Sequence, residues 1–173
     1  HDRADTAAPA PVTARCSDPG RTTVDALLGG RVRLRQPARG YRAATDPVLL
    51  AAAVPARAGQ TALDLGCGAG AAALCLAARV PGVAVTGLEL QADYAALARE
   101  NAAEAGGAVE VLEGDVARPP AALRARSFDH VLTNPPWHAG AATASPDPGR
   151  DAAQREALPL ADWIDAALRR LAP

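Results

Sequence analysis

Residues 134–137, Asn-Pro-Pro-Trp, carry the most specific chemistry in the sequence. Two successive prolines fix the backbone and remove two N–H donors, so carbonyl oxygens remain as the hydrogen-bonding groups. The side-chain carbonyl of Asn134 and the main-chain carbonyl of Pro135 can both accept from one NH2 group, which turns the nitrogen lone pair toward an electrophile. Trp137 offers a ring on which a flat base or amide can stack. The motif favours chemistry at a planar amino or amide nitrogen; its alternative is a turn that ends a strand.

A glycine-rich segment, Asp-Leu-Gly-Cys-Gly-Ala-Gly, begins at Asp64 between a short apolar run and a helical one. Gly66, Gly68 and Gly70 let the backbone approach a ligand closely, and the helix start presents free N–H groups. Glu89 ends the next apolar run, where a carboxylate can accept both hydroxyls of a ribose. The same pattern fits the dinucleotide-binding fingerprint, so a nicotinamide enzyme is an alternative. Asp64 favours a cationic ligand, such as a methionine ammonium or a sulfonium, because an acid there would repel a pyrophosphate.

A further carboxylate, Asp115, follows the third apolar run. It can accept a hydrogen bond from an adenine amino group, and its alternative role is that of a turn residue or a helix N-cap. The three cysteines, Cys16, Cys67 and Cys75, show no spacing typical of metal ligands. We therefore expect no metal site and reduced thiols.

The elements that must position these residues alternate between strands and helices. Strands are expected at 61–65, 83–88, 109–112 and 128–133, and helices at 71–80, 92–105 and 160–171. This alternation predicts an α/β fold with a doubly wound, mostly parallel sheet. Ligands of such sheets bind outside the carboxyl ends of the strands, so the glycine segment and the acidic and Asn-Pro-Pro residues should meet at one edge.

The first part of the chain is organised differently. Residues 1–21 are rich in Ala, Pro, Asp and Thr without periodicity, which predicts a flexible arm. Residues 31–35 alternate charged and apolar side chains, which predicts a half-exposed strand. Asp46 followed by Pro47 predicts the N-cap and first turn of a helix over residues 48–54.

Arginines are concentrated in this same part of the chain. The net charge of −1 shows no basic field of the whole protein that would indicate a nucleic-acid partner. Six arginines nevertheless lie between residues 21 and 42, where Asp25 is the single acid. Such a stripe can bind a phosphate backbone, and its alternative is a solvated strand face. The candidates for phosphate contacts are Arg33, Arg35 and Arg42, with Arg150 in a later loop.

Taken together, the motifs resemble those of class I S-adenosylmethionine-dependent methyltransferases with an Asn-Pro-Pro-aromatic sequence. Within that class the chain is similar to bacterial enzymes that methylate N6 of adenine in the anticodon loop of valine tRNA. The similarity runs from about residue 24 to the last residue and includes residues 29–36, 40–42, 45–50 and 145–150. It implies a Rossmann-like fold and methyl transfer from S-adenosyl-L-methionine to the exocyclic amino nitrogen N6 of adenine in tRNA.

The resemblance also implies roles for individual parts of the chain. Residues 22–58 would form a hairpin and short helix that lead into an S-adenosylmethionine-binding core at 59–173. The residues expected to hold the cofactor are Asp64, Gly66, Gly68, Gly70, Glu89 and Asp115, with Thr45 and Asp46 near its methionine end. The residues expected to hold the target amine are Asn134, Pro135 and Trp137, with the Arg150 loop able to close over it.

Other acceptors are compatible with the same motif. Protein glutamine N5-methyltransferases act on a side-chain amide but carry a longer helical domain than the lead-in expected here. A guanine N2-methyltransferase of ribosomal RNA and a non-catalytic methyltransferase-like binding subunit are further alternatives. Folds of this class carry strands beyond the fourth, so we expect the sequence to be part of a longer enzyme. Without an apolar run of the ~20 residues that a membrane span needs, and without a signal peptide, we expect a cytoplasmic protein.

Overall fold

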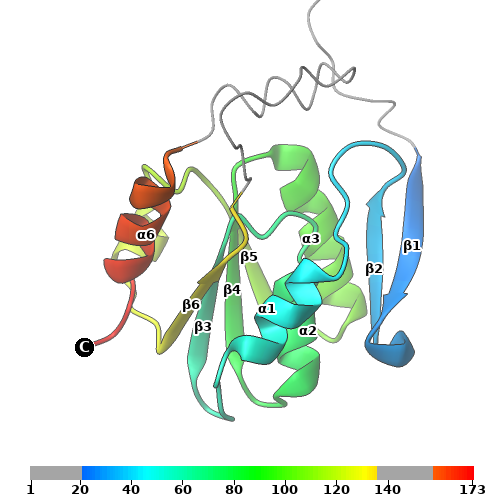
Figure 1. Cartoon of the computed structure of the whole chain (residues 1–173), viewed down its shortest axis with the longest axis horizontal. Helices are drawn as coiled ribbons and strands as arrows, with labels where there is room; N and C mark the ends of the chain where they lie inside the picture. The colour runs from blue at the N-terminus through cyan, green and yellow to red at the C-terminus, as the bar shows by residue number, and fades with distance from the viewer. Residues whose placement is uncertain (1–20, 136–157) are drawn as a thin grey trace, which may run out of the picture.

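A parallel β-sheet forms the centre of the molecule in the computed structural model, which describes residues 21–135 and 158–173 (Figure 1). Its strand order is β5-β4-β3-β6, and all three pairings are parallel. The strands are β3 (Thr61–Leu65), β4 (Ala84–Glu89), β5 (Val109–Glu113) and β6 (His130–Thr133). Crossover segments run between them, so the predicted doubly wound, mostly parallel α/β sheet is confirmed.

Helices cover both faces of this sheet because alternate strand residues point to opposite sides. On one face, Ala62, Val85 and Leu132 pack with α1 (Asp46–Ala53), α2 (Ala71–Arg79) and α3 (Ala92–Glu104). On the other face, Leu63 and Leu65 pack with Leu123 of α4 (Ala121–Arg124) and Trp163 of α6 (Leu160–Leu168). No helix in the described part of the chain is long and apolar enough to cross a membrane.

A separate antiparallel hairpin lies beside α3, at the right of Figure 1. It consists of β1 (Thr22–Leu27), the short 3-10 turn η1 (Leu28–Gly30) and β2 (Val32–Pro37). Val32 and Leu34 of β2 are buried in the core, whereas Arg33 between them is exposed. The predicted half-exposed strand at residues 31–35 is thereby confirmed.

Several element boundaries differ by one to three residues from the sequence prediction, and three of these differences have a clear physical cause. Asp46 is the first helical residue of α1, and Thr45 rather than Asp46 is the N-cap, because the Thr45 carbonyl accepts from the nitrogens of Val48 and Leu49. The last helix ends at Leu168 because residues 170–172 turn to run beside Phe128. Phe128 pairs only with that segment, so the fourth strand of the sheet begins at His130, two residues later than predicted.

Candidate active site

The turn between β3 and α2 is built from glycines that its backbone geometry requires. Gly66, Gly68 and Gly70 have φ angles of 70°, 56° and 92°, in the left-handed region that favours glycine. The main-chain nitrogens of Gly66 and Cys67 both donate to the Leu88 carbonyl, at 2.8 and 3.0 Å. These bonds hold the turn against the end of β4 and place the start of α2 over the sheet edge.

Gly66 and Gly68 differ in the space around them. A Cβ at Gly66 would lie 2.8 Å from the Trp163 ring, so α6 packs directly on this part of the backbone. Among the residues that the structure describes, a Cβ at Gly68 would meet only the ring of Tyr41, 4.0 Å away. The open side of Gly68 leaves room for a ligand to lie against the main chain.

Asp64, the last polar residue of β3, is a buried carboxylate without full compensation. Its side chain is 2% exposed, and its Oδ2 atom makes no hydrogen bond within the described part of the chain. The pKa of Asp64 is raised to about 7, because burial and the negative charge of Glu89 together outweigh a hydrogen bond from the Ala73 backbone that lowers it. An uncompensated acid of this kind attracts a cationic ligand group or a hydrogen-bond donor.

Glu89, at the end of β4, fastens the glycine turn to the next strand. It is 7% exposed, and its two oxygens accept from the main-chain nitrogens of Gly68 and Gln91, at 2.8 and 2.9 Å. Carboxylate oxygens have further lone pairs, so these bonds leave capacity for the hydroxyls of a ligand. Asp115 follows β5, where its Oδ1 accepts from the Ala117 nitrogen at 2.8 Å, the pattern of the turn residue that the sequence left as an alternative.

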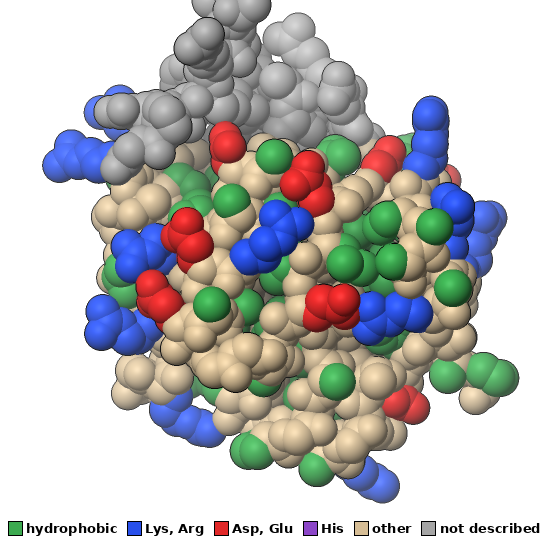
Figure 2. Space-filling view, turned by 180° about the vertical axis from the view of Figure 1, so that it is seen from behind, with side chains coloured by type: hydrophobic (Ala, Val, Ile, Leu, Met, Phe, Trp, Pro, Cys, Tyr) green, Lys and Arg blue, Asp and Glu red, His purple; other side chains and the backbone are tan. Residues whose placement is uncertain are grey.

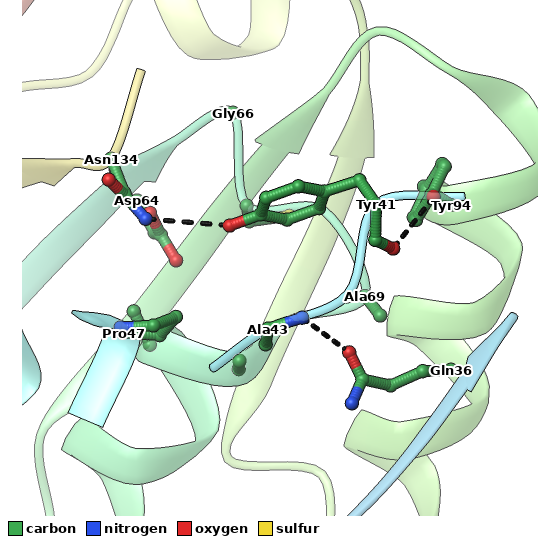
Figure 3. A pocket seen from close by; sticks show the side chains of 12 residues that line it. Gln36, Tyr41, Ala43, Pro47, Asp64, Gly66, Ala69, Tyr94 and Asn134 are labelled. Atoms are coloured by element: carbon green, nitrogen blue, oxygen red, sulfur yellow. Dashed lines mark hydrogen bonds between the residues drawn. The ribbon is translucent and has the colours of Figure 1, made fainter. Parts of the chain in front are cut away.

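A small cavity lies at the carboxyl edge of the sheet (Figure 3). The volume that a water-sized sphere can reach is about 50 Å³. Of the predicted site residues, Asp64, Gly66 and Asn134 line it, whereas the other predicted cofactor residues are not among its lining residues: Gly68, Gly70, Glu89, Asp115, Thr45 and Asp46. The other lining residues come from the lead-in, the glycine turn and the two neighbouring helices: Gln36, Tyr41, Ala43, Pro47, Cys67, Ala69, Ala71, Ala72 and Tyr94.

Asn134 reaches this cavity because β6 pairs with β3. Leu65 and Thr133 lie opposite each other in the two strands, and the Thr133 hydroxyl donates to the Leu65 carbonyl at 2.9 Å. The next residue, Asn134, donates from its Nδ2 atom to the Tyr41 hydroxyl oxygen at 3.4 Å. Pro135 follows, half-buried, while the expectations for Trp137 and Arg150 lie outside the described residues.

Tyr41 is a site residue that sequence reasoning did not single out. Its ring lies across the cavity with the hydroxyl directed at Asn134, as Figure 3 shows. Burial raises the pKa of this hydroxyl, and the negative charges of Asp46 and Asp64 raise it further. The Tyr41 hydroxyl therefore stays neutral at physiological pH. Through Tyr41, the lead-in lines the same cavity as Asp64 and Asn134.

Asn101 is a second residue that was missed, and it supports the site from behind. The side chain is fully buried in α3. Its Nδ2 atom donates to the carbonyls of Arg35 and Ala69, both at 2.9 Å, and its Oδ1 accepts from the Arg35 nitrogen at 2.8 Å. One amide thus ties the hairpin to the glycine turn. The available sequence signal was a polar residue on the buried face of a predicted helix.

The predicted phosphate-binding arginines are used in different ways. Arg35 pairs with Glu104 at 3.1 Å, and Arg42 pairs with Asp25 at 2.5 Å. Arg33 is exposed and forms no ion pair within the described residues. On the face shown in Figure 2, arginines are interspersed with acidic side chains rather than gathered in one patch. Of the three candidates Arg33, Arg35 and Arg42, the last two already pair with a carboxylate of the same chain. A phosphate would have to compete with those carboxylates.

The chain matches known proteins across this site. The family model described as methyltransferase small domain matches residues 44–147. A tRNA1(Val) (adenine(37)-N6)-methyltransferase from Yersinia enterocolitica is 39% identical over 113 residues, which are 64% of this chain and 44% of that protein. A release factor glutamine methyltransferase from Deinococcus radiodurans is 40% identical over 86 residues, 50% of this chain and 30% of that protein. The crystal structure of TrmN from Thermus thermophilus is similar with a TM-score of 0.52 and 26% identity, covering 75% of this chain and 34% of that one.

The chain therefore spans less than half the length of either curated relative. The matched segment contains α1, the glycine turn, Asp64, Glu89 and the Asn-Pro-Pro motif. Of these, Asp64, Gly66 and Asn134 line the cavity. No group of three or more His, Cys, Asp or Glu side chains able to hold a metal occurs among the described residues. With the fold, the site and more than half of the sequence in agreement, the chain belongs to the methyltransferase small domain family of enzymes.

Proposed function

We propose that the protein transfers a methyl group from S-adenosyl-L-methionine to an exocyclic amino nitrogen, N6 of adenine in tRNA. The observation that carries the proposal is that Asn134 and Asp64 line one cavity. Asn134, which can hold an amine, therefore lies in the same cavity as Asp64, an acid that suits a cationic methyl donor. The similarity to tRNA adenine N6-methyltransferases supports adenine as the target.

The residues around the cavity fit this cofactor. The Oδ2 atom of Asp64, which has no hydrogen-bond partner among the described residues, would suit the positively charged methionine end. Thr45 and Asp46 would lie near that end, and the charge of Asp46 acts on Tyr41 in the same cavity. The carboxylate of Glu89 retains lone pairs for ribose hydroxyls, and Gly68 offers open backbone beside them. Asp115 lies at the end of the adjacent strand, where its second oxygen can accept from the adenine amino group.

The bound cofactor would supply an activated methyl group on a sulfonium. The residues of this chain would then do the positioning. The Asn134 Oδ1 and the Pro135 carbonyl would each accept a hydrogen bond from the target NH2, which frees its lone pair for attack. The methyl group would pass to that nitrogen with the sulfonium sulfur as the leaving group, and the nitrogen would release one proton to solvent. Catalysis of this kind rests on orientation and exclusion of water.

The remaining roles complete the proposal. Trp137 would stack on the target base, and Arg150 would contact RNA. Arg33 would bind phosphate without breaking an ion pair described in the structure. Arg35 and Arg42 would first have to release Glu104 and Asp25. With tRNA as the substrate, we expect the protein to act in the cytoplasm.

The test is to incubate the full-length protein with total RNA and cofactor carrying an isotopically labelled methyl group, and to identify the modified nucleoside by mass spectrometry. We expect N6-methyladenosine, in a valine tRNA. A parallel reaction contains release factor proteins, because one of the relatives is a release factor glutamine methyltransferase. Label in N2-methylguanosine or in glutamine, without label in adenosine, would replace the proposed substrate. Absence of transfer to any acceptor would favour a binding subunit.

A further inference from the structure

The orientation of the Asn134 side chain decides whether it can serve the proposed reaction. A carboxamide has an acceptor oxygen and a donor nitrogen of nearly equal size, and rotation by half a turn exchanges them. Only the oxygen can accept from a target amino group. A residue that engages the nitrogen from the opposite side would therefore keep the oxygen available.

We propose that Tyr41 is the positioning residue that fixes the Asn134 carboxamide with its oxygen turned toward the target amine. Asn134 Nδ2 lies 3.4 Å from the Tyr41 hydroxyl oxygen and donates to it (Figure 3). This distance is at the long end for a hydrogen bond, and bonds inside active sites often shorten when the substrate complex forms. The inference rests on the proposed function, because it assigns the oxygen of Asn134 to the target nitrogen.

The charges around the phenol explain why its oxygen faces Asn134. A tyrosine hydroxyl can donate or accept, so a flipped carboxamide could in principle receive its proton. Asp46 and Asp64 are close enough for their negative charges to act on this hydroxyl, and they attract its proton. The lone pairs are then left for a donor, and the Nδ2 of Asn134 is the donor that the structure places there.

The loop that carries Tyr41 is fixed on both sides, as a positioning role requires. The Tyr94 hydroxyl donates to the Tyr41 carbonyl at 2.9 Å. On the other side, the Ala43 nitrogen donates to the Oε1 of the buried Gln36 at 2.7 Å. Between them Arg42 donates to the Pro37 carbonyl at 2.7 Å. The phenol therefore approaches Asn134 from a rigid base rather than from a free loop.

The test uses two substitutions in the full-length protein and measures transfer to tRNA. Tyr41→Phe keeps the ring and removes the hydroxyl, and we expect kcat to fall about tenfold while the affinity for cofactor changes less than about twofold. Asn134→Asp supplies the control, because a carboxylate has two acceptor oxygens and no orientation to fix. In the Asn134→Asp background, Tyr41→Phe should cost less than about twofold. An equal loss in both backgrounds would overturn the inference.

A spectroscopic readout separates this inference from the proposed function. In a ¹⁵N-labelled protein, the Asn134 carboxamide resonances are those that Asn134→Ala removes. We expect one of the two protons to be shifted downfield and slow to exchange, and both features to be lost in Tyr41→Phe. Resonances that do not respond to Tyr41→Phe refute the inference. Absence of methyl transfer by the wild-type protein refutes the proposed function and leaves the spectra to decide the role of Tyr41.

Discussion

The carboxylate of Glu89 is joined to the glycine turn by a hydrogen bond of 2.8 Å from the Gly68 nitrogen to its Oε2 atom. The same side chain accepts from the Gln91 nitrogen at 2.9 Å. Glu89 is therefore a structural residue before any ligand arrives, and its proposed contact with ribose is added to that role.

Replacing Glu89 should consequently affect both stability and binding. Glu89→Ala leaves two main-chain donors without their acceptor, and we expect the free energy of unfolding to fall by about 2 kcal/mol. The Kd for S-adenosylmethionine should rise at least about tenfold, as isothermal titration calorimetry would measure. Glu113→Ala provides the matched control, because Glu113 ends the adjacent strand but is exposed and pairs with Arg99 only at 3.9 Å. A similar loss of affinity in both variants would contradict the assignment.

The raised pKa of Asp64 predicts pH-dependent cofactor binding. The carboxyl group is largely protonated below about pH 7 and charged above it, so affinity for a cationic ligand should rise as the pH increases from 6 to 8. Calorimetric titrations across this range would show it. In Asp64→Asn the rise should disappear, and a rise that persists would assign it to another group.

The same pKa has a consequence of opposite sign for the folded protein. Because folding raises the pKa of Asp64 from 3.8 to about 7, the folded state binds this proton more tightly than the unfolded chain does. The resulting contribution to stability is complete below pH 3.8 and is lost as the pH rises through about 7. Thermal unfolding of Asp64→Asn compared with wild type at several pH values would isolate this contribution.

Alanine substitutions at the two glycines should separate stability from binding. Gly66→Ala adds a clash with Trp163 at 2.8 Å to the strain of a φ of 70°, and we expect a loss of about 2–4 kcal/mol in urea unfolding. Gly68→Ala has a φ of 56° but open space, so the loss should be nearer to 1–2 kcal/mol. Its methyl group would instead occupy the ligand side and raise the cofactor Kd. Equal destabilisation by both substitutions would show that α6 shifts and relieves the clash with Trp163.

Loss of Asn101 should loosen the hairpin and the glycine turn together. Asn101→Ala removes the side-chain partner of the buried Ala69 carbonyl and of the part-buried nitrogen and carbonyl of Arg35, and we expect a decrease in unfolding free energy of about 3 kcal/mol. Glu104→Gln, on the same helix, removes the exposed ion pair with Arg35 and should cost less than about 1 kcal/mol. Hydrogen exchange would show faster exchange at both Arg35 and Gly70 in Asn101→Ala. Faster exchange confined to the hairpin would mean that Asn101 is not needed to hold the glycine turn.

Asn134→Ala tests the catalytic assignment directly. Removal of the side-chain acceptor should lower kcat at least about 100-fold, a loss typical of removing one positioned hydrogen-bonding group from an active site. Cofactor affinity should stay nearly unchanged, because Asn134 is assigned to the target amine. If affinity fell as far as turnover, Asn134 would belong to the cofactor site instead. Single-turnover transfer and calorimetry on the same preparation would distinguish these results.

The sequence was informative where structure depends on local pattern. Alternating apolar runs and a glycine turn between strand and helix are set by neighbouring residues, so the sheet and the positions of Asp64 and Asn134 at its edge were predictable. Thr45 rather than Asp46 is the N-cap, because the Thr45 carbonyl accepts from the nitrogens of Val48 and Leu49. The Asp46-Pro47 pair alone does not show which residue precedes the first helical turn.

The missed residues depend on which distant segments meet. Tyr41 reaches Asn134 across 93 positions, and Asn101 reaches Arg35 across 66. Neither pairing has a signature in the chain, because it results from docking the hairpin against α3 and the sheet edge. For the same reason Arg35 and Arg42 read as free cations in the sequence, while the fold supplies each with a carboxylate.

The hydrogen bond from Thr133 to Leu65 joins the start of the Asn-Pro-Pro motif to the start of the glycine turn. The separation between the group that would accept a methyl and the group that would give it is therefore a property of two paired strands. Loops that recognise different acceptors can change in length and sequence without altering that separation. A scaffold of this design lets substrate choice diverge while the geometry of transfer stays constant.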